Sequence, residues 1–283
     1  MKFTEAQLEQ AFIELLQQEG FPHVRGEQIV RDTSEVLIKE DLKHFLLKEY
    51  SSKELTEQEA EQIIRQLESL PASDLYESNK AFMKKLSDGF QFTREDRSKK
   101  DIWVYLIDFQ NIENNNFKFV NQLEIEGFHK RIPDGILYVN GLPLVVFEFK
   151  TAIRENTTIH DAYLQLTNRY KRDIPELFKF NAFCVISDGV NNKAGSFFAS
   201  YEFFYAWRKI TGSETEVDGI DSMYSLIQGM FNKERLCDIL RNFIYLPDSS
   251  SKENKIVCRY PQFYAANKLY QNILNHRRLS PEE

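Results

Sequence analysis

The segment RIPDGILYVNGLPLVVFEFK holds three charged side chains in an otherwise apolar setting. Asp134 precedes the run Ile136–Val139, and Glu148 and Lys150 close the run Leu144–Phe149. The Asn-Gly pair between the two runs predicts a β-hairpin. Because side chains alternate along a strand, Glu148 and Lys150 point to the same face. A strand that is apolar on both faces belongs in the middle of a covered sheet, where an ionised group is costly unless it is paired or bound to a metal.

Two carboxylates and a lysine at one strand end form a site for a hard cation. Asp134 and Glu148 would hold Mg²⁺ through oxygen. The ion would polarise a phosphodiester and lower the pKa of a bound water. Lys150 would orient that water or offset charge on the attacked phosphate. These residue types therefore favour metal-dependent hydrolysis of a phosphodiester.

The hairpin has to bring the two carboxylates together. Asp134 and Glu148 share a face only if the two residue numbers of each cross-strand pair add up to an even value. A two-residue Asn-Gly turn gives an odd sum and would place the two carboxylates on opposite faces. We therefore predict a three-residue loop over residues 140–142 with Gly141 at positive φ, or a bulge with the same effect. A simpler interpretation is a turn aspartate plus a Glu–Lys ion pair. The apolar surroundings argue against it, because ionisable residues are rarely buried without a role.

A longer stretch resembles a known family. IPDGILYVNGLPLVVFEFKTA is similar to the nuclease core of the restriction (R) subunit of type I restriction–modification enzymes, a family within the PD-(D/E)xK nuclease superfamily. The similarity continues through AYLQLTNRYKRDIPELFKFNAFCVISDG. By this resemblance Asp134, Glu148 and Lys150 are the catalytic triplet, with Asp134 and Glu148 as metal ligands.

The resembled family also carries, on the helix after the triplet, a Gln followed four residues later by a Tyr. Here Gln165 and Tyr170 are five residues apart. On a regular α-helix Gln165 shares a face with Arg169 rather than with Tyr170. We expect Gln165, Arg169 and Tyr170 to contact DNA or to support the triplet. The alternative for Tyr170 is core packing, because it lies on the apolar stripe of its helix.

The elements around this segment predict an α/β fold. The resemblance implies a PD-(D/E)xK nuclease core, in which helices flank a central mixed sheet. Helices are expected where a Thr cap precedes an amphipathic run, as at Thr4 and Thr56 and after Thr157 or Thr158. Glu9 on the first helix is a hypothetical helper of the metal site, although a solvated helix face is the simpler interpretation. The runs that predict strands or strand-like packing lie at 102–109, 117–126, 181–187, 197–198 and 203–207.

We expect two domains. Residues 1–210 form the endonuclease domain, with a helical insertion at about 27–90 that serves as scaffold or touches DNA. Residues 211–283 form a linker and helices that lead into a truncated motor domain, as the resemblance implies. Gln262, in the sequence Tyr-Pro-Gln, is a candidate adenine contact of that motor. The chain contains no GxxxxGK[ST] phosphate loop, so we expect ATP hydrolysis only in a longer protein.

The composition limits the mode of DNA binding. The chain has 36 Lys and Arg against 43 Asp and Glu, a net charge of −7. Affinity for a polyanion comes mainly from Lys and Arg, so basic groups must cluster locally or partners must hold the DNA. The candidate clusters are Lys99-Lys100, Lys130-Arg131 and Arg169-Lys171-Arg172. The three cysteines show no disulfide or zinc spacing, and no run is long enough to span a membrane, so we expect a cytoplasmic protein.

The leading hypothesis is a Mg²⁺-dependent DNA endonuclease domain of a type I restriction R subunit. The resemblance implies double-stranded DNA as substrate, methylation and specificity subunits as partners, and cleavage coupled to ATP-driven translocation by the full-length subunit. We expect little activity from the isolated chain. The alternative is a noncatalytic docking module that links the motor to the methylase core. The helical insertion and the aromatic segment Tyr201–Trp207 motivate this alternative.

Overall fold

The centre of the molecule is a mixed sheet of six strands in the order β1-β4-β7-β8-β9-β10. The computed structural model describes residues 4–150, 158–217, 219, 221–247 and 253–278. The pairs β1–β4 and β8–β9 are parallel, and the other neighbours are antiparallel. The strands are β1 (His23–Arg25), β4 (Phe117–Asn121), β7 (Gly135–Val139), β8 (Leu142–Phe149), β9 (Phe183–Ser187) and β10 (Asn192–Gly195).

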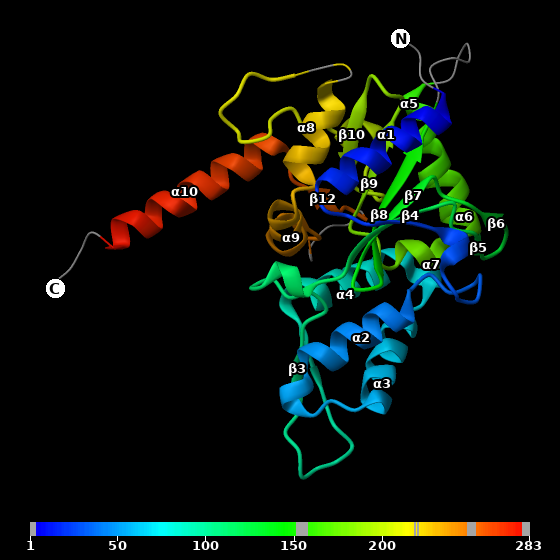
Figure 1. Ribbon diagram of the computed structural model, residues 1–283, viewed down its shortest axis with the longest axis vertical. Coiled ribbons are helices and arrows are strands. Elements are labelled where there is room, and N and C mark those ends of the chain that lie inside the picture. Colours follow the sequence, from blue (N-terminus) through cyan, green and yellow to red (C-terminus); the bar gives the residue numbers. More distant parts are fainter. Residues whose placement is uncertain (1–3, 151–157, 218, 220, 248–252, 279–283) are drawn as a thin grey trace.

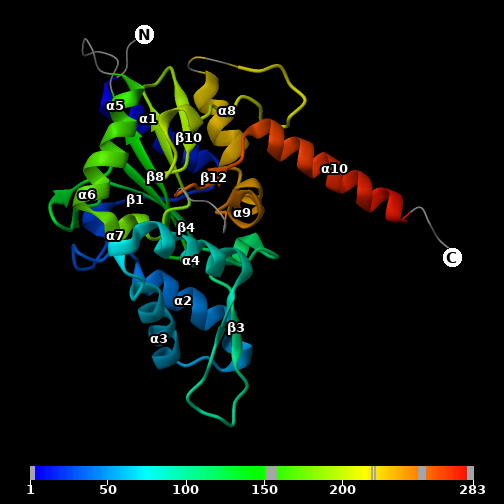
Figure 2. The same cartoon turned by 180° about the vertical axis from the view of Figure 1, so that it is seen from behind.

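Helices cover both faces of this sheet (Figures 1 and 2). On one face α1 contacts β8, where Phe12 stacks on Phe149 with ring centroids 4.6 Å apart, and α8 contacts α1 and β10. Phe231, directly after α8, adds a ring contact to Phe147. The other face carries α5, which contacts β8 and β9. The expected α/β class is therefore confirmed. The helices are α1 (Glu5–Gln18), α2 (Lys39–Glu49), α3 (Glu57–Glu68), α4 (Leu75–Asp88), α5 (Ile159–Leu164), α6 (Lys171–Asp173), α7 (Pro175–Phe178), α8 (Asp221–Met230), α9 (Lys233–Asn242) and α10 (Tyr260–Arg278).

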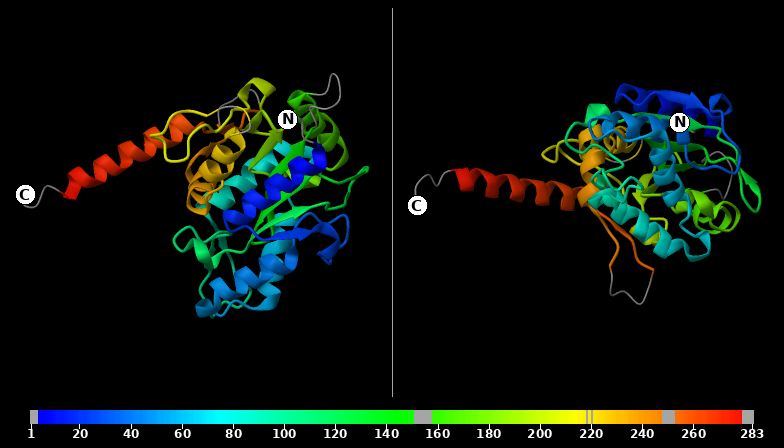
Figure 3. Two further views of the ribbon diagram at one scale, coloured as in Figure 1. Left: turned by 45° about the horizontal axis from the view of Figure 1, so that its top comes forward. Right: turned by 90° about the horizontal axis from the view of Figure 1, so that it is seen from below.

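Capping explains where three of these helices begin. Thr4, Thr56 and Thr158 each form a capping box with the residue three positions later, as the sequence predicts. None of the helices in the described ranges combines the length and apolar character needed to cross a membrane. Helix α10 extends away from the rest of the molecule (Figure 3). Short 3-10 turns lie at Gly26–Gln28, Ser51–Lys53, Ala72–Asp74, Ile112–Asn114 and Tyr201–Phe203.

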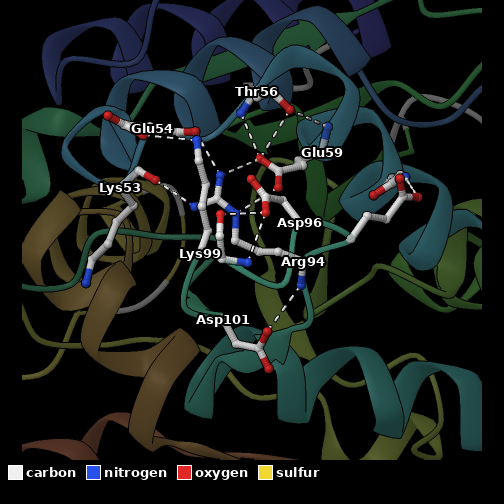
Figure 4. A network of polar contacts seen from close by, with 11 residues as sticks. Lys53, Glu54, Thr56, Glu59, Arg94, Asp96, Lys99 and Asp101 are labelled. Carbon is white, nitrogen blue, oxygen red and sulfur yellow. Dashed lines mark hydrogen bonds and ion pairs between the residues drawn. The ribbon is translucent and has the colours of Figure 1, made fainter.

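The helical block α2–α4 packs at the turn end of the β7–β8 hairpin. The Ile38 N–H donates to the Gly141 carbonyl at 2.9 Å, and a Cβ on Gly141 would lie 2.2 Å from the Ile38 oxygen. Only glycine therefore fits at this point of contact. A small hairpin of β2 (Phe90–Phe92) and β3 (Ile102–Val104) extends from the block and is clamped to α3 by Arg94 (Figure 4). The block is remote from the strand ends that carry Asp134 and Glu148.

Several strand boundaries differ from the prediction. The run 102–109 forms a strand only over β3, because the Asp108 side chain then accepts the N–H groups of Gln110 and Asn111 and turns the chain. The run 117–126 divides into β4 and β5 (Ile125–Glu126), and β5 pairs with β6 (Lys130–Arg131).

The aromatic segment after β10 is not a regular strand. Tyr205 makes an isolated bridge to Ala194, and the 3-10 turn replaces the rest of the expected strand. Further along the chain, β11 (Ile244–Tyr245) and β12 (Ile256–Val257) form a separate two-stranded sheet next to α9.

Candidate active site

A β-bulge brings the two carboxylates to one face of the sheet. Asn140 and Gly141 form a two-residue turn with φ of 51° and 77°, so the three-residue loop predicted from the sequence is wrong. Val139 pairs with Leu142, but the register then shifts by one residue and Gly135 pairs with Phe147. The even sum places Asp134 across from Glu148. The alternative prediction, a bulge with the same effect, is confirmed together with the positive φ of Gly141.

The three charged residues form a compact group at this strand end. The Asp134 Oδ2 accepts the N–H of Phe149 at 2.6 Å, which ties the aspartate to the neighbouring strand. The Glu148 side chain is fully buried, and its Oε1 accepts from Lys150 Nζ at 2.7 Å. Lys150 Nζ also donates to the Phe149 carbonyl at 2.8 Å. Lys150 therefore bonds directly to Glu148 and acts on Asp134 through its charge.

A π-helical turn restores the contact that the five-residue spacing is expected to lose. Residues Gln165–Tyr170 form this turn between α5 and α6. A π-helix has a wider turn than an α-helix, so residues five apart lie above one another. Gln165 Nε2 donates to the Tyr170 hydroxyl at 2.9 Å, and that hydroxyl donates to Glu148 Oε2 at 2.9 Å. The expectation that Gln165 does not face Tyr170 is therefore wrong.

Tyr170 both packs in the core and reaches the carboxylates. Its side chain is 1% exposed, as the packing alternative requires, and its hydroxyl also lies 3.4 Å from the Ile132 carbonyl. Arg169 points differently: it is exposed and has no ion pair among the described residues. Gln165 and Tyr170 thus approach Glu148, and Arg169 remains on the surface.

Burial raises the pKa values of both carboxylates, and neighbouring negative charges add to the effect. Desolvation raises the pKa of Glu148 to about 8, and the Asp134 charge adds to this effect against Lys150 and Tyr170. Desolvation raises the pKa of Asp134 to about 6, opposed by the Phe149 N–H and Lys150, with the charges of Glu9 and Glu5 adding to the rise. Both carboxylates therefore lie in surroundings that disfavour their ionised forms. A strongly perturbed pair of this kind, here at the ends of two central strands, is characteristic of functional sites.

The donor set fits a magnesium ion. Both carboxylates offer hard oxygen ligands, and Mg²⁺ commonly binds proteins through one or two carboxylates and keeps several waters. No group of three or more His, Cys, Asp and Glu side chains gathers for a metal within the described residues. Asp134 and Glu148 would therefore hold the ion with water and substrate oxygens completing its shell.

Helix α1 contributes a second group of polar side chains near the site, of which only Glu9 was considered from the sequence. Glu9 accepts from Asn121 Nδ2 at 2.6 Å and from Gln122 Nε2 at 3.2 Å. These residues line a cavity of about 430 Å³. The Glu9 charge contributes to the raised pKa of Asp134, so α1 lies within electrostatic reach of the site. The amides at the end of β4 were missed, and two polar residues closing an apolar strand are the signal that could have found them.

Gln262 lies apart from this group. Its Oε1 accepts the N–H of Arg259 at 2.9 Å at the start of α10. The aromatic segment Tyr201–Trp207, which motivated the docking alternative, is divided between core and surface: Phe204 and Trp207 are 2% and 3% exposed, whereas Phe203 is 52% exposed. The segment therefore both stabilises the core and presents an aromatic ring to solvent.

The chain is similar over most of its length to a known family of proteins. Residues 2–203 match the family model described as Type I restriction enzyme R protein N terminus, and the chain belongs to this family. It is 33% identical to the Type I restriction enzyme HindI endonuclease subunit of Haemophilus influenzae over 96% of this chain and 27% of that protein. It is 29% identical to the putative MjaIXP endonuclease subunit of Methanocaldococcus jannaschii over 92% of this chain and 27% of that protein. The chain thus spans about a quarter of these relatives' length.

Proposed function

We propose that this chain is the DNA-cutting part of a type I restriction R subunit, with a PD-(D/E)xK nuclease core. The observation that carries the proposal is the convergence of Asp134, Glu148 and Lys150 at the ends of β7 and β8, where Lys150 bonds to Glu148 and its charge acts on both carboxylates. A bound Mg²⁺ would supply Lewis-acid polarisation of the phosphodiester and acidify the attacking water. Hydrolysis joins the water oxygen to phosphorus and breaks one bond between phosphorus and a sugar oxygen, which takes up a proton.

The chain's own residues would prepare this step. Glu148 and Asp134 hold the ion, and Tyr170 fixes the Glu148 carboxylate through its O–H group. Gln165 in turn fixes the Tyr170 hydroxyl. Lys150 lies within 2.7 Å of Glu148, where its charge would stabilise the attacked phosphate or orient the water. Such preorganised charge is the main contribution that a protein makes to phosphoryl transfer.

The larger assembly would supply the remaining activities. The relatives are about four times as long as this chain, and the family resemblance implies methylation and specificity subunits and ATP-driven movement along double-stranded DNA. In that setting Gln262 would contact adenine in the motor. A net charge of −7 agrees with DNA held by the assembly rather than by this domain alone.

Cleavage by the complete complex tests the proposal. Asp134→Ala and Lys150→Ala should lose DNA cutting, and assembly with the other subunits should be retained. Glu40→Ala and Lys84→Ala are matched controls, because both positions are exposed and lie on α2 and α4 of the helical block. Cutting at the wild-type rate by both site variants would contradict the nuclease assignment and favour a noncatalytic docking module.

A further inference from the structure

A small hairpin projects beside the candidate active site. Strands β5 and β6 pair through Ile125 with Arg131 and Glu126 with Lys130, and the tip between them is Gly127-Phe128-His129. The hairpin protrudes from the side of the molecule next to α6 (Figures 1 and 2). It leads through Ile132 directly to Asp134, and the Ile132 carbonyl lies 3.4 Å from the Tyr170 hydroxyl. The hairpin and the site therefore share a framework.

The hairpin is held rigidly by the end of α6. The Asp173 carbonyl accepts the N–H groups of Phe128 at 2.8 Å and His129 at 3.5 Å. The fully buried Asp173 carboxylate accepts from Arg131 Nε at 2.7 Å and from Arg172 Nε at 2.6 Å. A Cβ on Gly127 would lie 2.3 Å from the Asp173 carbonyl oxygen, so this close approach requires glycine. The position of the tip is therefore fixed by charge, hydrogen bonds and backbone contact.

The fixed tip presents an apolar side chain to solvent. Phe128 is 78% exposed, and Ile132 at the base of the hairpin is 44% exposed. The contacts of Asp173 hold this ring outside the core, so they do not serve core packing. Single exposed apolar side chains are common on protein surfaces, so it is the fixed position of the Phe128 ring that distinguishes it.

Basic residues gather near the tip, although Lys130 is paired with Glu124 and both Arg131 and Arg172 are paired with Asp173. Lys130-Arg131 and Arg169-Lys171-Arg172 are far apart in the sequence, and the contacts of Arg131 and Arg172 with Asp173 bring them together. Arg169 and Lys171 are exposed, and neither has an ion pair among the described residues. Two unpaired cations beside an apolar tip match a partner that offers both phosphates and stacked bases.

We propose that the β5–β6 hairpin is a DNA contact: Phe128 wedges against the base stack of double-stranded DNA, and Arg169 and Lys171 neutralise its phosphates. The inference rests on the proposed nuclease function and extends it from the reacting phosphate to the flanking duplex. Because the hairpin is held in place before binding, little conformational entropy is lost when the ring enters the DNA. The wedge would hold the duplex in register with Asp134 and Glu148.

The test compares variants of this chain in the complete restriction complex acting on a double-stranded plasmid. Phe128→Ala should slow cutting roughly 5- to 100-fold, the range expected for loss of aromatic stacking on a base. Phe128→Trp should restore most of the rate, since it keeps the aromatic face. Tyr245→Ala removes a comparably exposed aromatic ring from β11 and should cut like wild type. Arg169→Ala with Lys171→Ala should reduce cutting most at low salt, and its cutting should fall less steeply than that of wild type as salt rises.

The outcomes separate the inference from the nuclease proposal. Cutting lost with Asp134→Ala but unchanged with Phe128→Ala would overturn the wedge alone. Cutting unchanged with Asp134→Ala would overturn both. Subunit assembly, followed by size-exclusion chromatography, must survive Phe128→Ala. A complex that falls apart with Phe128→Ala but not with Tyr245→Ala would overturn the DNA contact, because the tip would then bind a protein subunit.

Discussion

Two groups of charged residues in this molecule are built in opposite ways. In the helical block, the Arg94 guanidinium forms two 2.8 Å bonds to the Glu59 carboxylate and donates to the carbonyls of Lys53 and Glu54 (Figure 4). One positive group meets one negative group, and the remaining donors are satisfied. At the ends of β7 and β8, Asp134 and Glu148 lie near Lys150, which bonds to Glu148 and acts on Asp134 through its charge. The first group is balanced in charge, and the second is not.

The pKa directions follow from this difference. The Arg94 hydrogen bonds lower the pKa of Glu59, so its carboxylate is stabilised in the ionised form. Burial and the Asp134 charge raise the pKa of Glu148, so its ionised form is disfavoured. A balanced ion pair stabilises a local structure, whereas an unbalanced one retains a demand for a cation. The comparison therefore separates a structural cluster from a chemical one without reference to any relative.

The largest expected effect comes from removing one carboxylate of each group. Glu148→Gln should lower DNA cutting by roughly a thousandfold or more, because it removes charge where the metal would bind. Glu59→Gln should cost about 2–3 kcal/mol of stability by leaving Arg94 without its partner, and its effect on cutting should follow the loss of folded protein. Thermal melts and cleavage rates of both variants measure the contrast. A Glu59→Gln enzyme that is stable but inactive would contradict the purely structural role given to the Glu59–Arg94 pair.

A pH series gives an intermediate effect. For Glu148 the folded-state pKa is raised to about 8, so its contribution to stability is present below its unfolded pKa and is lost as pH rises through about 8. For Glu59 the folded-state pKa is lowered, so its contribution is present above the unfolded pKa and is lost as pH falls. The metal-free protein should therefore melt at lower temperature as pH rises from about 6 to about 8.

Magnesium should oppose this loss, because the ion competes with the proton on Glu148. Mg²⁺ affinity should rise about tenfold per pH unit over that interval. Calorimetric titration in buffers of different ionisation enthalpy would report the proton released on binding. The Glu148→Gln variant is the control and should show neither trend. Affinity that does not change with pH would indicate that the ion does not bind at Glu148.

The sequence predicted the candidate site residues better than it predicted the backbone conformation of the hairpin. Strand alternation and apolar context were enough to single out Asp134, Glu148 and Lys150, because these rules act locally. Strand alternation also required the residue numbers of each β7–β8 pair to add up to an even value. It could not choose between a longer loop and a bulge at Leu144, since that choice depends on how Asn140 bonds to the Leu106 carbonyl and Asn115.

Longer-range contacts explain the other misses. The run 102–109 has strong strand propensity throughout, but it pairs with β2 only over three residues before Asp108 turns the chain. The π turn at Gln165–Tyr170 brings the Tyr170 hydroxyl to Gln165 of the same turn and to partners far away in the sequence, Glu148 on β8 and the Ile132 carbonyl. Neither could be obtained from helix or strand periodicity alone.

The smallest effect is expected from shortening the π turn, and it tests whether the turn has a role of its own. Deleting the exposed Asn168 places Gln165 and Tyr170 four residues apart, where a regular α-helix aligns them. Cutting should stay within about threefold of wild type, whereas Tyr170→Phe should reduce it about tenfold by removing the O–H donated to Glu148.

An alanine inserted after Asn168 is the matched control, because six residues exceed what either helix type can align. It should reduce cutting at least as much as Tyr170→Phe, and thermal melts would exclude general unfolding. If the Asn168 deletion were as inactive as the insertion, the wide turn itself would be needed at the site. Activity retained by the deletion would mean that the π turn accommodates one extra residue while keeping Tyr170 on the carboxylate. The π turn would then serve only to align Tyr170 with Glu148, and the excess of carboxylates over Lys150 would remain the feature that calls for a metal ion.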